Sequence, residues 1–530
     1  MKNTLKIMFF LTILFEISFA KVSTIVDNNL QSSPDLKKSM KVQSRPDYLP
    51  KQYVTPEGHF RIHYTLDGQH AVSDADTLYP NVNYPDWIVE TGIAAERSYS
   101  ILIDSLGFEA PPENNKDGPE YDIYVREFGH TSDYGGTTPE MKINNTDRDH
   151  DWYSYIEIDN DYDDGGKYYT NGLEGLRATI AHEFFHMVQL GYNYFDGDVF
   201  FLEWSSVWFE DIAYPQVNDY LQYKAFFKNP QESIWSTAGY GRLGFYHYSL
   251  GVFLRYFTEN YGAELLRKIW DEIKERDALA AMQKIIPKET GKNIPWHINR
   301  FYRICYFSGS RYDPDYSLIE DAIYFPDFNY TALDTFSQKD GTNFSSKTNP
   351  YGTNIFKLAF TENQYIGIDR KILYNDTLFG GYIEDYYFEK RSVEFSLMED
   401  TFVGETGPED TLVVFITNSS QNKSMDYSFS ISERDKPMLA SKIDNIYPNP
   451  INPTSGNRLN FVFQTDLRHG SFTANLYNIL GERVSKQKYS LRFEKEEYQF
   501  PIRSDLSSGV YILKVGSGNK YESKKITILK

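Results

Sequence analysis

Cysteine is almost absent from this chain of 530 residues, because Cys305 is the only one. A single thiol has no second cysteine in the chain with which to form a disulfide. The fold therefore cannot depend on an intrachain disulfide framework, and a metal site built on several cysteines is excluded.

The chain also lacks long hydrophobic runs and an excess of positive charge. Beyond its first residues, no segment is long and apolar enough to cross a membrane, so we expect no transmembrane segment in the mature chain. Lys and Arg number 54 against 74 Asp and Glu, which gives a net charge of −20. Without a basic stripe to replace condensed counterions, such a chain is a poor partner for nucleic acid. We interpret the charge as a soluble acidic surface.

The N-terminus has the features of an export signal. A lysine-containing start leads into an apolar stretch from Ile7 to Phe15, and Ser18-Phe19-Ala20 has the small-x-small pattern of a cleavage site. The apolar stretch is too short to span a bilayer. We predict that residues 1–20 are a cleaved signal peptide. The polar residues 21–50, which contain three prolines, are predicted to be a linker or short propeptide.

The most informative motif is His182-Glu183-Phe184-Phe185-His186, an H-E-x-x-H pattern inside a predicted helix over 172–190. Residues four apart lie on one face of a helix, so His182 and His186 can direct both imidazoles at one Zn²⁺. Glu183 is then placed to take a proton from the attacking water as a general base. This pattern is typical of a metallopeptidase.

Two histidines leave a catalytic zinc short of one protein ligand. A metzincin would supply a third histidine in H-E-x-x-H-x-x-G-x-x-H, but Gln189 and Tyr192 stand where the glycine and the last histidine belong. The metzincin pattern is therefore absent, and the ligand must come from further along the chain.

A predicted second helix, separated from His186 by residues 187–202, carries two carboxylates, Glu203 and Glu210. Positions seven apart share a helical face, so spacing alone leaves both residues open as the ligand. The arrangement resembles the gluzincins, the group of thermolysin and the zinc aminopeptidases. This resemblance implies Glu203 as the ligand and Glu210 as a second carboxylate beside the site. Leu202 departs from the pattern, because an Asn usually precedes the ligand.

The resemblance carries further expectations. Gluzincins stabilise the oxyanion with a Tyr or His from the C-terminal lobe, and the cluster Tyr246-His247-Tyr248 makes Tyr246 and His247 the candidates here. Packing of aromatic rings is the alternative for each of them. The segments around H-E-F-F-H-M-V-Q and W-F-E-D also resemble a poorly characterised family of secreted bacterial metallopeptidases, which says little about the substrate.

Alternating carboxylates in Asp159-Asn160-Asp161-Tyr162-Asp163-Asp164-Gly165-Gly166 raise the question of a Ca²⁺ site. An EF-hand needs Gly at the sixth position and Glu at the twelfth, where this chain has Asp164 and Thr170. A solvated loop is the favoured interpretation, and Ca²⁺ stays a minor hypothesis.

Hydrophobic periodicity predicts three structured regions. Residues 51–307 begin with strands at 59–64, 121–126 and 153–158 and a helix over 85–106, and become mostly helical after the H-E-x-x-H motif. Residues 308–436 change to strands and turns typical of an antiparallel β-sandwich. Residues 437–530 form a third unit, also rich in strands. The expected fold class is an α+β zincin-like catalytic domain with a mostly helical C-terminal lobe, followed by two all-β sandwich domains.

The last region contains several short motifs. These are Tyr447-Pro448-Asn449-Pro450 near its start, Leu476-Tyr477-Asn478 with Leu480-Gly481-Glu482 in the middle, and Ser508-Gly509-Val510-Tyr511 before a basic tail. Together they closely resemble the C-terminal sorting domain of substrates of the Bacteroidetes type IX secretion system. The resemblance implies contact with that secretion machinery and delivery to the outer-membrane cell surface or the medium.

The sequence thus predicts an exported zinc metallopeptidase that binds one Zn²⁺ per chain and hydrolyses a protein or peptide substrate. The alternative is a surface binding or adhesion protein whose zincin-like domain is catalytically idle. The intact Glu183 between the two histidines argues against the alternative, because a general base has no structural purpose there.

Overall fold

The computed structural model describes residues 45–530 apart from gaps at 74, 114–117, 129–132, 144–150, 164, 166–167, 194–195, 237–244, 315, 337–341, 373–376, 385–389, 394–400, 407–409, 434–441, 455, 465–469, 492–494 and 518–519. The predicted signal peptide and most of the predicted linker or propeptide lie outside the described residues. The chain divides into two compact units, Met1–Glu433 and Arg434–Lys530. The prediction of helices together with several β-sheets and a β-rich C-terminal part is confirmed.

The first unit opens with a five-stranded mixed sheet in the order β1-β2-β3-β5-β4. Its strands are β1 (Lys51–Val54), β2 (Phe60–Tyr64), β3 (Tyr121–Val125), β4 (Gly135–Lys142) and β5 (Trp152–Ile158). The strand pairs β2/β3 and β3/β5 are parallel, whereas β1 and β4 run antiparallel to their neighbours at the two edges. The strands predicted near 59–64, 121–126 and 153–158 are confirmed, and β1 and β4 are additional.

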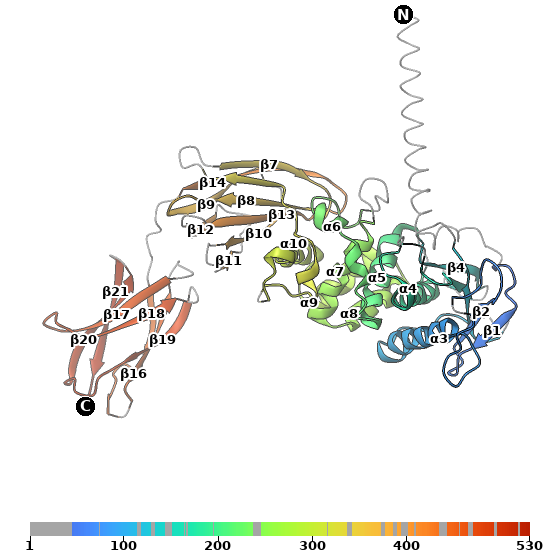
Figure 1. Cartoon of the computed structure of the whole chain (residues 1–530). Helices are drawn as coiled ribbons and strands as arrows, with labels where there is room; N and C mark the ends of the chain where they lie inside the picture. The colour runs from blue at the N-terminus through green and yellow to red at the C-terminus, as the bar shows by residue number, and fades with distance from the viewer. Residues whose placement is uncertain are drawn as a thin grey trace, which may run out of the picture. The chain divides into compact units, whose positions relative to one another are not determined.

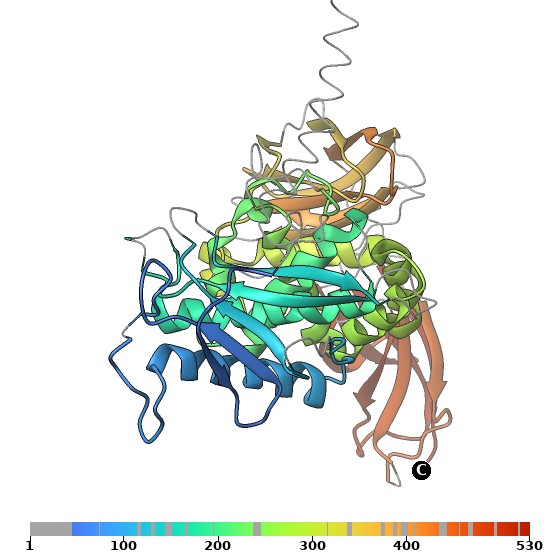
Figure 2. The same cartoon turned by 90° about the vertical axis from the view of Figure 1, so that its right-hand side faces the viewer.

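Two long helices pack with this sheet. Helix α3 (Asp86–Tyr99) continues into the π-helical turn η3 (Ser100–Ser105), and α4 (Gly172–Tyr192) contains the H-E-x-x-H motif. The apolar residues of α3 and η3 recur at helical spacing, so that Ile88, Ala95 and Leu102 are fully covered. Figure 2 shows α3 and the strands of the sheet side by side. Both helices contact the sheet and each other, which places the motif against the edge strand β4.

Helices dominate the chain after the motif, as predicted. They are η4 (Asp196–Asp198), α5 (Val199–Ala213), η5 (Asp219–Gln222), α6 (Ala225–Lys228), η6 (Tyr248–Leu250), α7 (Gly251–Tyr261), α8 (Glu264–Ile273), α9 (Ala278–Thr290), α10 (Ile294–Tyr306), η7 (Gly309–Arg311) and η8 (Ala322–Tyr324). Figure 1 labels α5 to α10 of these helices, coloured from green to yellow in chain order. Helix α9 was not predicted and contains Pro287 in its last turn.

Two sheets follow the helices. One has the order β11-β10-β13-β8-β6 and the other the order β12-β9-β14-β7. Their strands are β6 (Ala332–Thr335), β7 (Thr342–Thr348), β8 (Thr353–Ala359), β9 (Gln364–Ile372), β10 (Thr377–Glu384), β11 (Lys390–Val393), β12 (Thr401–Thr406), β13 (Thr411–Asn418) and β14 (Met425–Glu433). Phe356 from one sheet and Phe429 from the other share a core, with ring centroids 5.4 Å apart.

These sheets are joined to the helices before them. Asn299 on α10 donates from Nδ2 to Thr417 Oγ1 on β13 at 2.8 Å, and Tyr306 packs edge-on against Phe415. The core of the helical part extends into Ile355 and Val413 of the sandwich. The predicted boundary between 307 and 308 therefore falls inside one compact unit, and a separate domain over 308–436 stays a prediction.

The second unit is all β. Its sheets have the orders β15-β16-β19 and β18-β17-β20-β21. The strands are β15 (Lys442–Tyr447), β16 (Arg458–Gln464), β17 (Gly470–Asn478), β18 (Arg483–Leu491), β19 (Lys495–Pro501), β20 (Gly509–Ser517) and β21 (Lys520–Ile528). Phe463 and Phe472 stack between the two sheets, with ring centroids 4.3 Å apart. As far as the structure describes it, the buried core of this unit consists of residues between Ile443 and Ile528.

The N-terminal segment is joined to the first sheet by the half-buried Arg45. Arg45 lies 2.8 Å from Asp122 on β3 and 2.8 Å from Glu140 on β4. Leu49 packs with aromatic side chains of the same sheet. Arg45 and Leu49, which lie at the end of the predicted linker or propeptide, therefore contact the folded unit.

Among the residues that the structure describes, none of the helices combines the length and apolar character that crossing a membrane requires.

Candidate metal centre

Helices α4 and α5 bring together the three residues that we predicted as metal ligands. His182 and His186 lie on α4 and Glu203 lies on α5, and all three are buried. His182 Nε2 lies 3.0 Å from His186 Nε2, and Glu203 Oε2 lies 3.3 Å and 3.5 Å from these two nitrogens. In the described part of the chain this is the one group of His, Cys, Asp and Glu that could hold a metal ion.

The outer edge of each imidazole is held by a neighbour. His182 Nδ1 lies 2.6 Å from Glu210 Oε1, and His186 Nδ1 lies 2.8 Å from Gln189 Oε1 and 3.2 Å from Ser206 Oγ. These contacts fix the rings so that both Nε2 atoms face the same point. Such partners orient metal-binding histidines and raise their basicity.

Glu203 and Glu210 share one face of α5 but contact opposite edges of His182. Glu203 faces Nε2, together with His186, whereas Glu210 reaches Nδ1 on the far side of the ring. Among the described residues, Glu203 and not Glu210 belongs to the group of three that could hold a metal ion. The assignment of Glu203 as the ligand stays a prediction.

Neighbouring charged groups shift the pKa values of the buried His182 and Glu203. Burial disfavours the cation of His182, but hydrogen bonds to Glu203 and Glu210 hold the pKa of His182 well above its ordinary value. Burial would likewise raise the pKa of Glu203, yet the neighbouring His186 and His182 hold it well below the usual range. The carboxylates around the two rings therefore make this a site that favours positive charge.

Glu183 is the next residue on α4 and faces the edge strand β4. Thr137 Oγ1 on β4 lies 2.8 Å from Glu183 Oε2 and 2.8 Å from the Glu183 carbonyl oxygen. Gly135 permits this approach, since a Cβ there would lie 2.6 Å from Thr179 Cγ2 and 3.2 Å from Glu183 Cγ. Thr137 thus positions the carboxylate that we predicted as the general base.

The two predicted oxyanion donors lie in different surroundings. Tyr246 is fully buried, and its hydroxyl lies 3.4 Å from the carbonyl oxygen of Glu232, in the aromatic core. Burial lowers the pKa of His247, and the charge of Glu203 opposes that shift. Tyr248 is the member of this cluster whose ring stacks on His182, with centroids 6.0 Å apart and planes 8° apart. A catalytic role for Tyr246 and His247 stays a prediction.

Sequence reasoning missed the roles of three residues around the centre: Thr137, Gln189 and Ser206. Tyr248 belonged to the predicted cluster but was not the member chosen. Gln189 and Ser206 carried a usable signal, because they lie on the same helical faces as His186 and Glu203. Thr137 carried no sequence signal. It lies 46 residues before Glu183 and contacts it only because the pairing of β4 with β5 places β4 beside α4.

In the aspartate loop before α4, the carboxylate of Asp159 accepts hydrogen bonds from backbone N–H groups. Asp159 Oδ1 accepts hydrogen bonds from the N–H groups of Asp161 and Tyr162, and Asp159 Oδ2 accepts one from Phe128 N–H. These bonds fit the loop interpretation. Asp164 lies outside the described residues, and the Ca²⁺ hypothesis stays a prediction.

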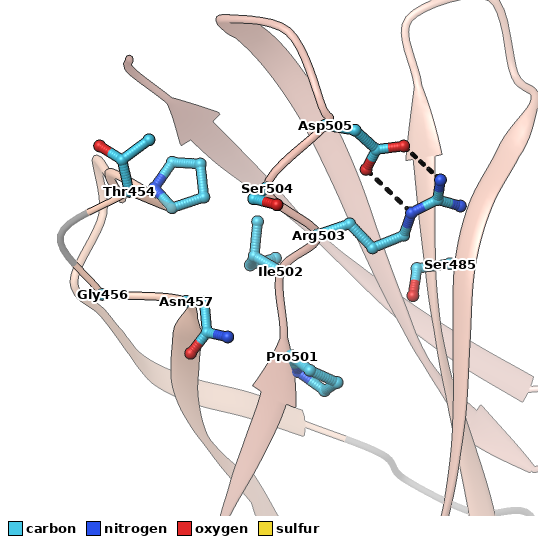
Figure 3. Close-up of a pocket in the computed structure, with 10 residues that line it drawn as sticks. Thr454, Gly456, Asn457, Ser485, Pro501, Ile502, Arg503, Ser504 and Asp505 are labelled. Atoms are coloured by element: carbon cyan, nitrogen blue, oxygen red, sulfur yellow. Dashed lines mark hydrogen bonds and ion pairs between the residues drawn. The ribbon is translucent and has the colours of Figure 1, made fainter.

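A further cavity of about 720 Å³ lies in the second unit (Figure 3). Its wall includes Arg503, which lies 3.0 Å from Asp505 through Nε and Oδ1. Asn457 and Ser485 line other parts of it. The described residues that line this cavity include neither histidine nor a second carboxylate.

Solved structures offer only remote similarity. PliG of Salmonella Typhimurium, a periplasmic inhibitor of g-type lysozyme, is 10% identical over 19% of this chain and 99% of its own, with a TM-score of 0.15. The glycoside hydrolase domain of Endo-D from Streptococcus pneumoniae R6 is 12% identical over 35% of this chain and 33% of its own, with a TM-score of 0.14. The β-glucuronidase of Faecalibacterium prausnitzii is 7% identical over 33% of this chain and 36% of its own, with a TM-score of 0.13. At these TM-scores none of the three bears on function.

No curated protein matches this chain. A family model does match its second unit: residues 445–529 correspond to the secretion system C-terminal sorting domain. The predicted motifs from Tyr447 to Tyr511 all lie within this match. Such a domain implies a Bacteroidetes protein that interacts with the type IX secretion machinery. The chain therefore carries a C-terminal sorting domain at residues 445–529 and is secreted by the type IX system to the cell surface or the extracellular space.

Proposed function

We propose that this protein is an exported zinc metallopeptidase of gluzincin type on a zincin-like scaffold. The observation that carries the proposal is the convergence of His182, His186 and Glu203, whose ligand atoms all lie within 4.8 Å of one another in a buried site. Glu183 follows the first ligand directly, so a general base is placed beside the same point.

The donor set fits zinc. Two imidazole nitrogens and one carboxylate oxygen are the ligands of many catalytic zinc sites, which keep a fourth position open. Ligand atoms about 2.0–2.1 Å from a tetrahedral ion are separated from one another by about 3.3 Å. The separations of 3.0, 3.3 and 3.5 Å among the three ligand atoms match that spacing.

When bound, zinc supplies a Lewis acid that polarises a peptide carbonyl and lowers the pKa of water toward about 7. The residues of this chain supply the proton transfers. Glu183 takes a proton from the attacking water and passes it to the leaving amine. Thr137 holds one oxygen of the Glu183 carboxylate, which keeps the base in one orientation. Glu210 and Gln189 hold the two imidazole rings during the reaction.

Replacement of Glu183 tests this role. We expect Glu183→Gln to keep zinc but to lose cleavage of an unbiased peptide library by about 10²-fold or more, because an amide cannot accept the proton. The matched control is Glu174→Gln, an exposed glutamate on the same helix, which should retain wild-type cleavage.

Two outcomes would contradict the proposal. Equal cleavage by wild type and Glu183→Gln would remove Glu183 from the reaction. No cleavage by zinc-loaded wild type, after removal of residues 21–44, would favour the alternative of a catalytically idle binding or adhesion protein.

A further inference from the structure

The hairpin that joins β17 and β18 carries two solvent-exposed aliphatic side chains at its tip. Ile479 is 76% exposed and Leu480 is 79% exposed. Among the other described residues of this unit, the exposed large apolar side chains are Leu529 at 51%, Tyr447 at 45% and Tyr521 at 36%. Single exposed apolar residues are common, but two adjacent ones with this exposure form a small apolar surface of their own.

The tip is held rigid by Asn478. Its Oδ1 accepts hydrogen bonds from Leu480 N–H at 3.0 Å and Glu482 N–H at 2.9 Å, and its Nδ2 donates to Glu482 Oε2 at 2.7 Å. Gly481 completes the turn with a φ of 81°, which other residues rarely adopt. A turn fixed in this way presents Ile479 and Leu480 in one orientation, which lowers the entropic cost of binding.

The neighbouring residues are polar. Glu482 and Arg483 follow the apolar pair and are exposed, so the tip has an apolar centre and a charged border. This is the composition of a small protein contact site, in which apolar groups enter a pocket and polar groups surround it. The unit belongs to a family of sorting domains, so the secretion machinery must contact its surface.

We propose that the apolar tip, formed by Ile479 and Leu480 on the turn fixed by Asn478, inserts into an apolar pocket of a protein of the type IX secretion machinery. The tip is then a recognition element of the sorting domain. This inference rests on the family match and does not depend on the proposed peptidase activity.

The test is export of the full-length chain in a bacterium that has a type IX system. We expect Ile479→Ser combined with Leu480→Ser to lower the exported fraction at least about tenfold, as loss of a central contact does at protein interfaces. The thermal unfolding midpoint should stay within a degree or two of wild type, because both side chains are already exposed. Asn478→Ala should give a smaller loss, since it frees the turn but keeps the apolar side chains.

The chain offers a matched control in its first unit. Ile323 and Tyr324 are also adjacent and exposed, at 51% and 66%. Ile323→Ser combined with Tyr324→Ser should leave export unchanged.

Three results would overturn the proposal. Normal export of the Ile479→Ser and Leu480→Ser double variant would show that the machinery does not use the tip. A large fall in its unfolding midpoint would show a structural role instead. Binding of the purified wild type, but not of the double variant, to phosphatidylethanolamine and phosphatidylglycerol vesicles would make the tip a membrane contact.

Discussion

Glu210 contacts His182 at the ring edge that faces away from His186 and Glu203, with 2.6 Å between Oε1 and Nδ1. The opposite edge of the same ring, at Nε2, faces Glu203 and His186. The two glutamates of α5 are therefore not interchangeable. Glu203 completes the group that could hold a metal, and Glu210 orients one of its histidines.

Measurements of zinc affinity should distinguish the residues that orient the two histidines from neighbouring residues that do not contact them. We expect Glu210→Gln to weaken zinc binding by about 10- to 100-fold, the usual cost of losing a partner of a metal-binding histidine. Chelator competition measures this. Two adjacent serines provide a matched pair: Ser206→Ala should weaken zinc binding because it contacts His186, whereas Ser205→Ala, which contacts Phe201 and Trp270, should not. Equal affinities for all these variants would contradict the account.

The sequence predicted the local part of the centre well. The pair His182 and His186 follows from helical spacing alone, and so does the position of Glu183. The choice between Glu203 and Glu210 did not follow, because it depends on how α5 crosses α4. The cluster at 246–248 was harder still, because Phe245 has a positive φ of 50° and only Tyr248 lies in a helix, the short η6. Tyr246 and His247 precede both η6 and α7, so helical spacing does not give their orientation.

In the fold as well, features with a clear local sequence pattern were predicted, and features without one were not. Strand β2, with clear apolar alternation, was predicted closely. The edge strands β1 and β4 were missed because β1 buries only Tyr53, and β4 begins with Gly135 and Gly136 and contains Pro139, residue types that strands disfavour. The join between the helices and the sandwich was also missed. It depends on contacts such as Asn299 with Thr417, which no local pattern contains.

Stability should depend on pH through Asp198. This carboxyl accepts a hydrogen bond from Ala278 N–H at 2.9 Å, but burial raises its pKa to about 7. Because its pKa in the unfolded chain is about 4, the folded state binds an extra proton between these values, and its stability falls by about 1.4 kcal/mol per unit as pH rises through that window. Asp198→Asn should therefore gain stability relative to wild type between pH 5 and pH 8. If the unfolding free energies of wild type and Asp198→Asn changed with pH in the same way across this range, the raised pKa of Asp198 would be contradicted.

Loss of Arg45 should destabilise the first sheet. Arg45→Ala would leave Asp122 and Glu140, both buried, without the guanidinium between them. Removal of one partner of a fully buried ion pair costs about 3–5 kcal/mol. We expect a smaller loss here, because Arg45 is half-buried and His63 stays 2.7 Å from Asp122. Urea unfolding of the mature chain measures this loss, and the exposed Lys51→Ala provides a control with a small effect. Similar stabilities for the two variants would show that residues 45–50 do not belong to the fold.

Deletion of Arg434–Lys530 should leave the first unit folded but retained in the periplasm. The core of the second unit contains only residues from Ile443 to Ile528, so the cores of the first unit lose no member. Cell fractionation and thermal unfolding of the truncated chain check both parts of this prediction. Surface or medium localisation of the truncated chain would contradict the sorting role.

The central claim is that His182, His186 and Glu203 bind one zinc ion, and metal stoichiometry by native mass spectrometry tests it most directly. We predict one zinc per chain in the wild type and in Glu210→Gln, and none in Glu203→Ala. A wild-type chain that binds no zinc after incubation with the ion would contradict the claim, and so would a Glu203→Ala chain that keeps its zinc while Glu210→Ala loses it.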